Sequence, residues 1–286
     1  MNPVAFEIFG LQIRWYGIII AGGVLAAFLL SSVLAKKKGV SFDDIVDAFI
    51  WAFPIAIVGA RAYYVAFEFK NFDSFADMIN IRTGGLAIHG GLIAGIITAY
   101  IVLRIKKVNF WEYIDVVIPA VVLAQGIGRW GNFMNHEAHG GAVSSDFISR
   151  FPEFIQKGML INGSYYHPTF LYESVCDVLI CLILIYILFK KKKQHGIVLG
   201  AYLILYSSAR FFIEGLRTDS LMFMGLRIAQ VISIVGIFSI PSFFRASIGS
   251  FFFTNCSLIG IPKGKSFFFA IPFFCISCSK SSSGIT

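Results

Sequence analysis

Residues 111–137 read WEYIDVVIPAVVLAQGIGRWGNFMNHE, an apolar run that ends in a dense polar cluster. The first part, up to about residue 130, is long enough to cross a bilayer as a helix, which takes about 20 residues. Its end brings Arg129, two asparagines, Glu137 and several glycines close to one hydrophobic-to-water boundary. Guanidinium and amide groups are donors that suit a phosphate or ester oxygen, and glycine lets backbone approach a ligand closely. The alternative for Arg129 is an ordinary interfacial arginine that reaches for lipid headgroups.

The composition of the whole chain indicates a polytopic membrane protein. Of 286 residues, 57% are hydrophobic and 14% are charged, and the mean hydropathy is +0.77, which is more apolar than a soluble core requires. Seven apolar runs reach the length of about 20 residues that a span needs. They lie at 13–35, 44–69, 86–105, 111–130, 168–190, 196–215 and 226–245. Because open sheet edges cannot face lipid, we expect an all-α fold, a membrane bundle of about seven transmembrane helices.

The sequence divides into a membrane domain and an atypical tail. We assign residues 1–245 to one integral domain, with a small extracytoplasmic head at about 131–167. Residues 246–286 are rich in Phe and Ser, with few charges and no clean helical period. We interpret this tail as a translated frameshift or another terminal alteration. The alternative is an interfacial segment that uses Phe as a membrane anchor.

The basic residues predict which way the chain crosses the membrane. The formal charge of +8 is not a nucleic-acid signature, because the lysines and arginines gather in short clusters between the apolar runs. These clusters are Lys36–Lys38, Arg104 with Lys106 and Lys107, and Lys190–Lys193. The positive-inside rule places such ends in the cytoplasm, so we expect the N-terminus outside. The linkers 70–85, 131–167 and 216–225 then lie on the outer face.

Costly polar residues gather at the outer ends of the predicted spans. They are Arg14, Tyr16, Arg61, Tyr64, His89, Arg129, Asn132, Asn135, Glu137, His167, Tyr172, Glu173, Tyr206, Arg210, Glu214 and Arg217. An ionisable group inside a bilayer costs about 2.5–3.5 kcal/mol, so it is kept mainly where it pairs or functions. Arg210 and Glu214 stand four residues apart and can form an ion pair on one helix face. One such stripe could be a structural seam between helices, whereas five spans contributing to one level favour a polar chamber for an anionic headgroup.

The absence of several motifs limits the chemistry that this level could perform. The sequence contains no HExxH, no GxSxG and no nucleotide-binding loop. What remains is a histidine as a possible base, arginines as phosphate clamps, and Tyr and Asn as supports, a set that suits group transfer from a bound phosphate. His89, followed by two glycines, fits the base, although a membrane histidine can equally be a satisfied helix contact. Cys275 and Cys278 have CxxC spacing but no second ligand pair.

Several stretches resemble the prolipoprotein diacylglyceryl transferase family. GRWGNFMNHEAHG at 128–140 is similar to the family signature, and further matches follow the family order. They are WYG at 15–17, GGLAIHGGLIAG at 84–95, HPTFLYE at 167–173 and YSSARFFIEGLR at 206–217. The resemblance implies a seven-span enzyme of the bacterial inner membrane that begins lipoprotein maturation. Such enzymes move the diacylglyceryl group of phosphatidylglycerol onto the thiol of a lipobox cysteine in a prolipoprotein signal peptide.

The resemblance also implies roles for individual residues. Arg129 and Arg210 would hold the phosphatidylglycerol headgroup and stabilise the departing phosphate, and His89 would be a candidate base for the thiol. The remaining pocket residues would be Tyr16, Asn132, Asn135, Glu137, Gly140, Tyr206 and Glu214. Neither a metal ion nor an organic cofactor is expected for the family. The partners would be phosphatidylglycerol, prolipoprotein signal peptides and membrane lipid, without nucleic acid.

Two other functions remain as alternatives at this point. An arginine-lined chamber also suits a transporter or channel for an anionic small molecule, although transporters commonly show related halves and sites near the midplane. A metal-dependent phosphatidyl-alcohol transferase would need a carboxylate cluster. Asp43, Asp44 and Asp47 could suggest one, but they fit the start of a helix better.

Overall fold

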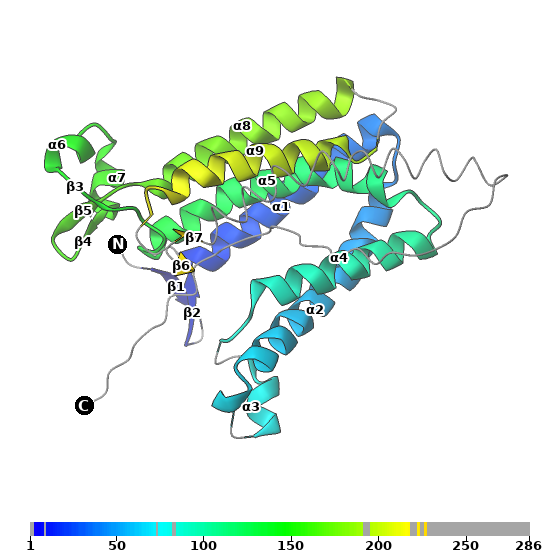
Figure 1. Ribbon diagram of the computed structural model, residues 1–286, viewed down its shortest axis with the longest axis horizontal. Coiled ribbons are helices and arrows are strands. Elements are labelled where there is room, and N and C mark those ends of the chain that lie inside the picture. Colours follow the sequence, from blue (N-terminus) through cyan, green and yellow to red (C-terminus); the bar gives the residue numbers. More distant parts are fainter. Residues whose placement is uncertain are drawn as a thin grey trace. The chain divides into compact units, whose positions relative to one another are not determined.

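In the computed structural model, the described residues are 3–8, 10–72, 74–81, 84–190, 195–217, 222–223 and 226–227. Within them, six helices are long and apolar enough to cross a membrane (Figure 1). These are α1 (Trp15–Lys38), α2 (Phe42–Phe67), α4 (Ile88–Ile105), α5 (Phe110–Met134), α8 (Thr169–Lys190) and α9 (Ile197–Glu214). They confirm the first six predicted spans and the helical membrane fold.

The predicted seventh span and the predicted tail fall almost wholly outside the described residues. Of the span 226–245, the structure describes Leu226–Arg227, which form strand β7 and pair with β6 (Met222–Phe223). Residues 246–286 lie outside the described part of the chain. Near the N-terminus, β1 (Val4–Ile8) and β2 (Leu11–Arg14) pair antiparallel and lead directly into α1.

The chain groups into two compact units, which are described separately. Among the described residues, one unit holds Leu30–Val117, and the other holds the residues up to Leu29 together with those from Ile118 to Arg227. The first therefore contains α2, α4 and the short elements between them. The second contains most of α5, the first part of α1, and α8 and α9.

In the 30–117 unit, α2 and α4 pack closely because glycines line their contact. A Cβ on Gly59 would lie 2.8 Å from the carbonyl oxygen of Gly90, so neither helix has room for a larger residue there. Small residues of this kind are typical of close helix pairs in membranes. At its start, α2 is capped by the Ser41 side chain, which accepts a hydrogen bond from the Asp44 amide. The aspartates therefore do begin a helix, and Asp44 and Asp47 form ion pairs with Lys106.

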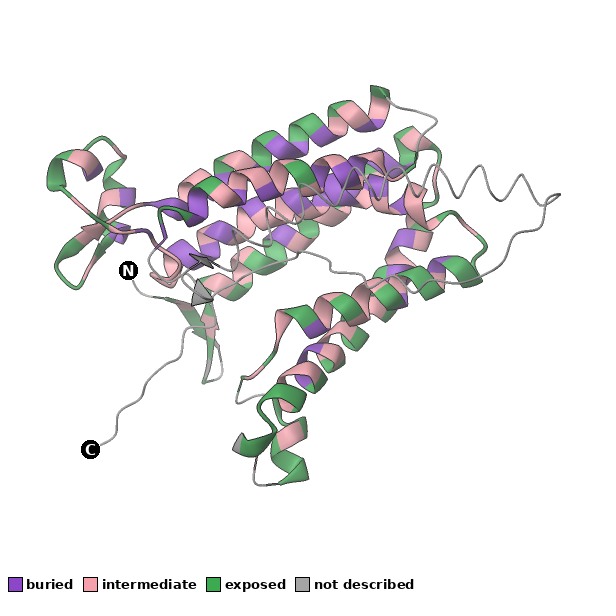
Figure 2. Cartoon of the chain, viewed as in Figure 1, coloured by how far each residue is buried: buried purple, intermediate pink, exposed green. Residues whose placement is uncertain are grey.

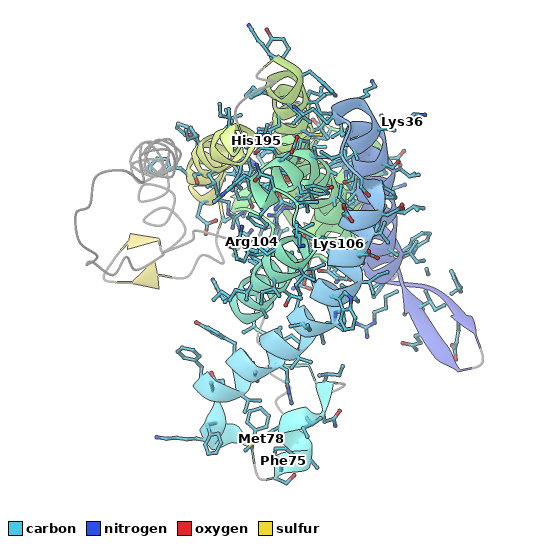
Figure 3. The ribbon with its side chains drawn as sticks, turned by 90° about the vertical axis from the view of Figure 1, so that its right-hand side faces the viewer. Lys36, Phe75, Met78, Arg104, Lys106 and His195 are labelled. Atoms are coloured by element: carbon cyan, nitrogen blue, oxygen red, sulfur yellow. The ribbon has the colours of Figure 1, made fainter. Side chains whose placement is uncertain are left out.

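Arg61, near the end of α2, holds the following segment in place. That segment contains η1 (Phe69–Asn71) and α3 (Phe75–Ile79). The guanidinium donates to the backbone carbonyls of Asp77, Met78, Gly84 and Gly85, at 2.6–2.9 Å. Figure 3 labels Phe75 and Met78 on this segment; in the same unit it labels Arg104 on the last turn of α4 and Lys106 just after that helix. Arg61 thus stabilises local architecture by bonds to neutral acceptors.

In the other unit, α5, α8 and α9 lie side by side and turn their buried residues toward one another (Figures 1 and 2). Glycines again permit the closest approaches. A Cβ on Gly126 of α5 would lie 3.1 Å from the Asp177 Cβ of α8, and one on Gly23 of α1 would lie 3.3 Å from the Ala124 carbonyl oxygen. Apolar side chains such as Leu25 and Leu182 remain about 60% exposed, as residues facing lipid would be.

The predicted head region folds into short elements between α5 and α8. They are β3 (Ala142–Val143), α6 (Ser145–Ile148), α7 (Glu153–Gly158), β4 (Leu160–Ile161) and β5 (Ser164–Tyr166). The three strands form an antiparallel sheet in the order β3-β5-β4. A small core beneath them consists of Phe133, Ile148, Ile155, Met159 and Phe170. Because Phe133 and Phe170 belong to α5 and α8, this core anchors the head to both membrane helices.

Candidate active site

Arg129 owes its position to the length of α5. The sequence predicted that the span ends near residue 130, whereas the helix continues to Met134. Arg129 and Asn132 therefore lie on helical turns, and both are buried. Asp115 and Pro119 earlier in the same helix do not interrupt it. The signature stretch thus begins inside a span and leaves it within a few residues.

Glu173 of α8 is the centre of a buried ion cluster. Its Oε2 lies 2.6 Å from Arg129 Nε, and its Oε1 lies 2.9 Å from an Nη of Arg210. Arg217 approaches the same Oε1 at 3.6 Å. The side chains of all four residues are at most 7% exposed. One carboxylate thus gathers guanidinium groups from α5, from α9 and from the chain beyond α9.

Glu214 completes the cluster on α9. The predicted pairing of Arg210 with Glu214 is confirmed, with 2.7 Å between Arg210 Nη2 and a Glu214 oxygen. The cluster therefore holds three guanidinium groups and two glutamates, which leaves one positive charge. Buried ion pairs contribute little to stability because desolvation offsets their attraction, so a cluster of this kind favours a functional role. Its excess positive charge suits an anion.

The backbone around Gly140 pairs with the backbone of Arg217 and holds it in place. The two residues form an isolated antiparallel bridge, and the Gly141 amide donates to the Leu216 carbonyl at 3.1 Å. A Cβ on Gly140 would lie 2.6 Å from the His167 Cβ and 2.9 Å from the Leu216 carbonyl oxygen. The predicted substrate-binding residue Gly140 is thus a point of close backbone approach, where glycine is required.

The polar residues after Arg129 form a second group beside the cluster. Asn132 and Asn135 both donate to Glu137 Oε1, at 3.1 and 3.4 Å. The backbone turns sharply here, because His136 and Ala138 adopt positive φ values of 53° and 59°. This turn folds the Glu137 carboxylate back toward α5.

Two tyrosines complete the predicted pocket residues within this unit. Tyr16 packs on Gly131, whose added Cβ would lie 2.9 Å from the tyrosine ring, and it interacts electrostatically with Glu137 and Arg129. The Tyr206 hydroxyl is hydrogen-bonded to the Arg129 guanidinium. The structure therefore brings together Arg129 with Tyr206, Arg210 with Glu214, and Asn132 with Asn135 and Glu137.

His89, the predicted base, belongs to the 30–117 unit. It lies on the first turn of α4 with an exposed side chain, and its ring centroid is 6.3 Å from that of Tyr63. Its role in proton transfer remains a prediction.

The sequence interpretation missed Glu173 and Arg217 as site residues. Both were visible as costly polar residues at the outer level, and Arg217 continues the Arg210 face. The signal for Glu173 was its place in HPTFLYE, at the start of a span, where no cation stands at helical spacing to reveal its partners. Its partners come from other helices, so its central position became apparent in the fold.

Comparison with known proteins assigns the chain to a family. A family model described as prolipoprotein diacylglyceryl transferase matches residues 3–244. The chain belongs to the prolipoprotein diacylglyceryl transferase family. The match includes all residues of the ion cluster, and the predicted tail, 246–286, lies beyond it.

Curated relatives of high identity support the same assignment. The phosphatidylglycerol–prolipoprotein diacylglyceryl transferase 1 of Clostridium perfringens is 62% identical over 238 residues, which are 83% of this chain and 91% of the relative. The enzyme of the same name from Clostridium kluyveri is 56% identical over 245 residues, 85% of this chain and 96% of the relative. That of Clostridium botulinum (strain Loch Maree) is 55% identical over 238 residues, 83% and 93%. Family membership favours a membrane-embedded transferase over the transporter alternative.

Proposed function

We propose that this protein transfers the diacylglyceryl group of phosphatidylglycerol to the thiol of the lipobox cysteine in prolipoproteins. The observation that supports this most strongly is the buried cluster of Arg129, Arg210 and Arg217 around Glu173, in a chain of this family. The cluster carries excess positive charge inside a membrane helix unit. Phosphatidylglycerol brings one negative charge on its phosphodiester, and the guanidinium groups of the cluster are the donors that would bind it.

In the proposed reaction, the thiol sulfur forms a bond to C3 of the diacylglyceryl group. The C3–oxygen bond breaks, its electron pair goes to the phosphate oxygen, and glycerol phosphate leaves. The thiol proton passes to a base, for which His89 is the candidate. The phosphate gains one negative charge in this step, so guanidinium groups beside it would stabilise the transition state more than the ground state.

The remaining residues would position the two substrates. Arg129 and Arg210 would bind the phosphate, because a guanidinium offers paired donors and stays charged. Asn132, Asn135 and Glu137 could hold the glycerol hydroxyls of the headgroup, since they carry both donors and acceptors. Tyr16 and Tyr206 flank the same arginine.

We also propose that the protein resides in the bacterial inner membrane with its N-terminus outside. The support is the distribution of basic residues on the helices. Lys36, Lys37 and Lys38 occupy the last turn of α1, and Arg104 occupies the last turn of α4. The positive-inside rule puts these ends in the cytoplasm and the ion cluster near the outer surface.

The proposed function is tested by transfer of labelled diacylglycerol from phosphatidylglycerol to a lipobox peptide in detergent solution. Detergent removes the membrane barrier, so a transporter would give no product. We expect transfer by the wild-type protein and a fall of about 100-fold or more in Arg129→Ala and Arg210→Ala. Arg104→Ala is the matched control, because Arg104 is exposed and lies on the last turn of α4, the end of that helix proposed to face the cytoplasm. Wild-type levels of transfer in both cluster variants would overturn the proposed clamp.

A further inference from the structure

Below the ion cluster, the same three helices carry a second polar level. On α8, Asp177 follows Glu173 by one helical turn, and on α5, Gln125 precedes Arg129 by one turn. On α9, Tyr202 and Tyr206 precede Arg210 by two turns and one turn. Helices α5 and α9 end near the ion cluster, whereas α8 begins there. Earlier residues on α5 and α9 and later residues on α8 therefore all lie deeper in the helix group than the cluster.

Gln125 and Tyr202 of this level hydrogen-bond to each other, whereas one carboxylate oxygen of Asp177 has no such partner among the described residues. The Gln125 side-chain amide donates to the Tyr202 hydroxyl at 3.0 Å, and the hydroxyl lies 3.3 Å from the Gln125 carbonyl oxygen. Asp177 is 2% exposed, and its Oδ2 has no hydrogen-bond partner among the described residues. A buried carboxylate oxygen without a partner is costly, so such an oxygen calls for a functional explanation.

Packing places Asp177 against the helix that carries Arg129. Its Cβ lies beside Gly126, which stands one turn before Arg129 and has no side chain to hold α8 away. From there the carboxylate interacts electrostatically with Arg129, Arg210 and Glu173. The printed donors of these arginines point to Glu173 and Glu214, so Asp177 acts on the cluster through its charge.

Counting Asp177 changes the charge of the site from one positive charge to zero. Three guanidinium groups then face the carboxylates of Glu173, Glu214 and Asp177. A fixed negative charge behind the anion site repels a dianion twice as strongly as a monoanion at the same place. In the proposed reaction the substrate phosphate is a monoanion and the product phosphate becomes a dianion. Substrate and product phosphate therefore differ in negative charge, and the negative charge of Asp177 repels the product more strongly.

We propose that Asp177 is a specificity-determining residue that lets the site hold a phosphodiester monoanion and release a phosphomonoester dianion. This inference rests on the proposed function, because that reaction supplies both ligands. Asp177 would act on the phosphate through space and through Arg129, without touching the substrate. Its removal should tighten product binding more than substrate binding.

The test compares Asp177→Asn with the wild-type protein in the transfer assay at pH 8, where a phosphomonoester is a dianion because its second pKa is about 6. The two measured quantities are the KM for phosphatidylglycerol and the inhibition constant of glycerol phosphate. In Asp177→Asn we expect the KM to fall about threefold and the inhibition constant about tenfold, since the effect scales with ligand charge. Asp177→Glu should keep the wild-type ratio.

A buried carboxyl outside the cluster provides the control. Asp115→Asn removes a carboxylate that is 4% exposed and should leave the ratio of the two constants unchanged. A general loss of structure would lower activity in either variant, but it would not shift product affinity relative to substrate affinity. An unchanged ratio in folded Asp177→Asn overturns the inference.

A second measurement needs no variant. The wild-type protein should bind glycerophosphoglycerol, the deacylated monoanionic headgroup, about threefold more tightly than glycerol phosphate in competition assays, because Asp177 weakens the binding of a monoanion about threefold and of a dianion about tenfold. Equal or reversed affinities overturn the inference even if Asp177→Asn does not fold. If the wild-type protein transfers no diacylglyceryl group, the proposed function itself fails; transfer without this charge preference refutes only the role of Asp177.

Discussion

Arg61 and Arg129 are both buried arginines at the end of membrane helices, and their surroundings differ in kind. Arg61 donates to four backbone carbonyls of residues 77–85, which belong to the local fold. Arg129 is held by the Glu173 carboxylate, which it shares with Arg210 and Arg217. Backbone carbonyls cannot leave without unfolding the segment, whereas a carboxylate can exchange with another anion. The comparison distinguishes an arginine that builds structure from arginines that can bind a ligand.

The largest expected effect is a difference in transfer activity between lysine variants of Arg129 and Arg61. Arg129→Lys keeps the charge but loses the planar set of donors, so we expect transfer activity to fall about 100-fold. Arg61→Lys should lower the melting temperature but leave activity per folded molecule within about threefold, because its partners are structural. The measurements are initial transfer rates and thermal unfolding in detergent on the same preparations. A larger loss of specific activity in Arg61→Lys than in Arg129→Lys would reverse the comparison.

The next effect concerns the stability of the Glu173 cluster. Glu173→Gln leaves three buried guanidinium groups without their shared carboxylate, and removing one partner of a buried ion pair costs about 3–5 kcal/mol. We expect a marked loss of thermal stability, measured by unfolding in detergent. Glu153→Gln is the matched control, since Glu153 forms an ion pair with Lys157 that is mostly exposed. If both variants melt alike, Glu173 is not the centre that holds the arginines.

The sequence allowed the spans and part of this site to be predicted. Apolar runs define the helices because their length and composition are local properties. The pairing of Arg210 with Glu214 was likewise predictable, because both residues stand on one helix at a spacing of four. Arg129 was recognised by its polar neighbours along the chain.

The rest depended on contacts between segments that are distant in sequence. Nothing near Glu173 in the chain shows that arginines from other helices converge on it. Arg61 was grouped with the other outer-level arginines, since the carbonyls that hold it come from a later loop. Gly140 was predicted as a substrate-binding residue, and the fold adds a packing reason for its lack of a side chain.

A smaller effect is expected at Gly140, which supports the backbone of Arg217. In Gly140→Ala, the new Cβ would lie 2.6 Å from the His167 Cβ, so the bridge to Arg217 must shift. Overpacking of this kind costs about 1–3 kcal/mol, and we expect reduced stability together with reduced transfer. Gly128→Ala is the control, because its nearest heavy atom would be 3.5 Å away on a flexible Ile20 side chain. Equal behaviour of the two variants would show that the bridge tolerates movement.

The smallest effect is expected at Lys106, a third kind of cation in this protein. Its ammonium hydrogen-bonds to Asp44 and Asp47 on α2, and these contacts raise the pKa of Lys106. A raised pKa means that the contribution to stability is complete below the ordinary lysine value of about 10.5 and is lost as the pH rises through the higher folded value. Between pH 6 and pH 9 the melting temperature of Lys106→Met should therefore differ from wild type by a constant amount.

That constant should be small, within about 2 °C, because water screens an exposed ion pair. The contrast with Arg61 follows from burial, since both cations hold neighbouring segments of the same unit, one in water and one among carbonyls. A drop in melting temperature of more than about 5 °C in Lys106→Met would be on the scale of a buried interaction. The ion pairs of Lys106 with α2 would then contribute as much to the stability of that unit as the hydrogen bonds of Arg61. The separation between exposed and buried cations drawn from their partners would then have to be abandoned for this unit.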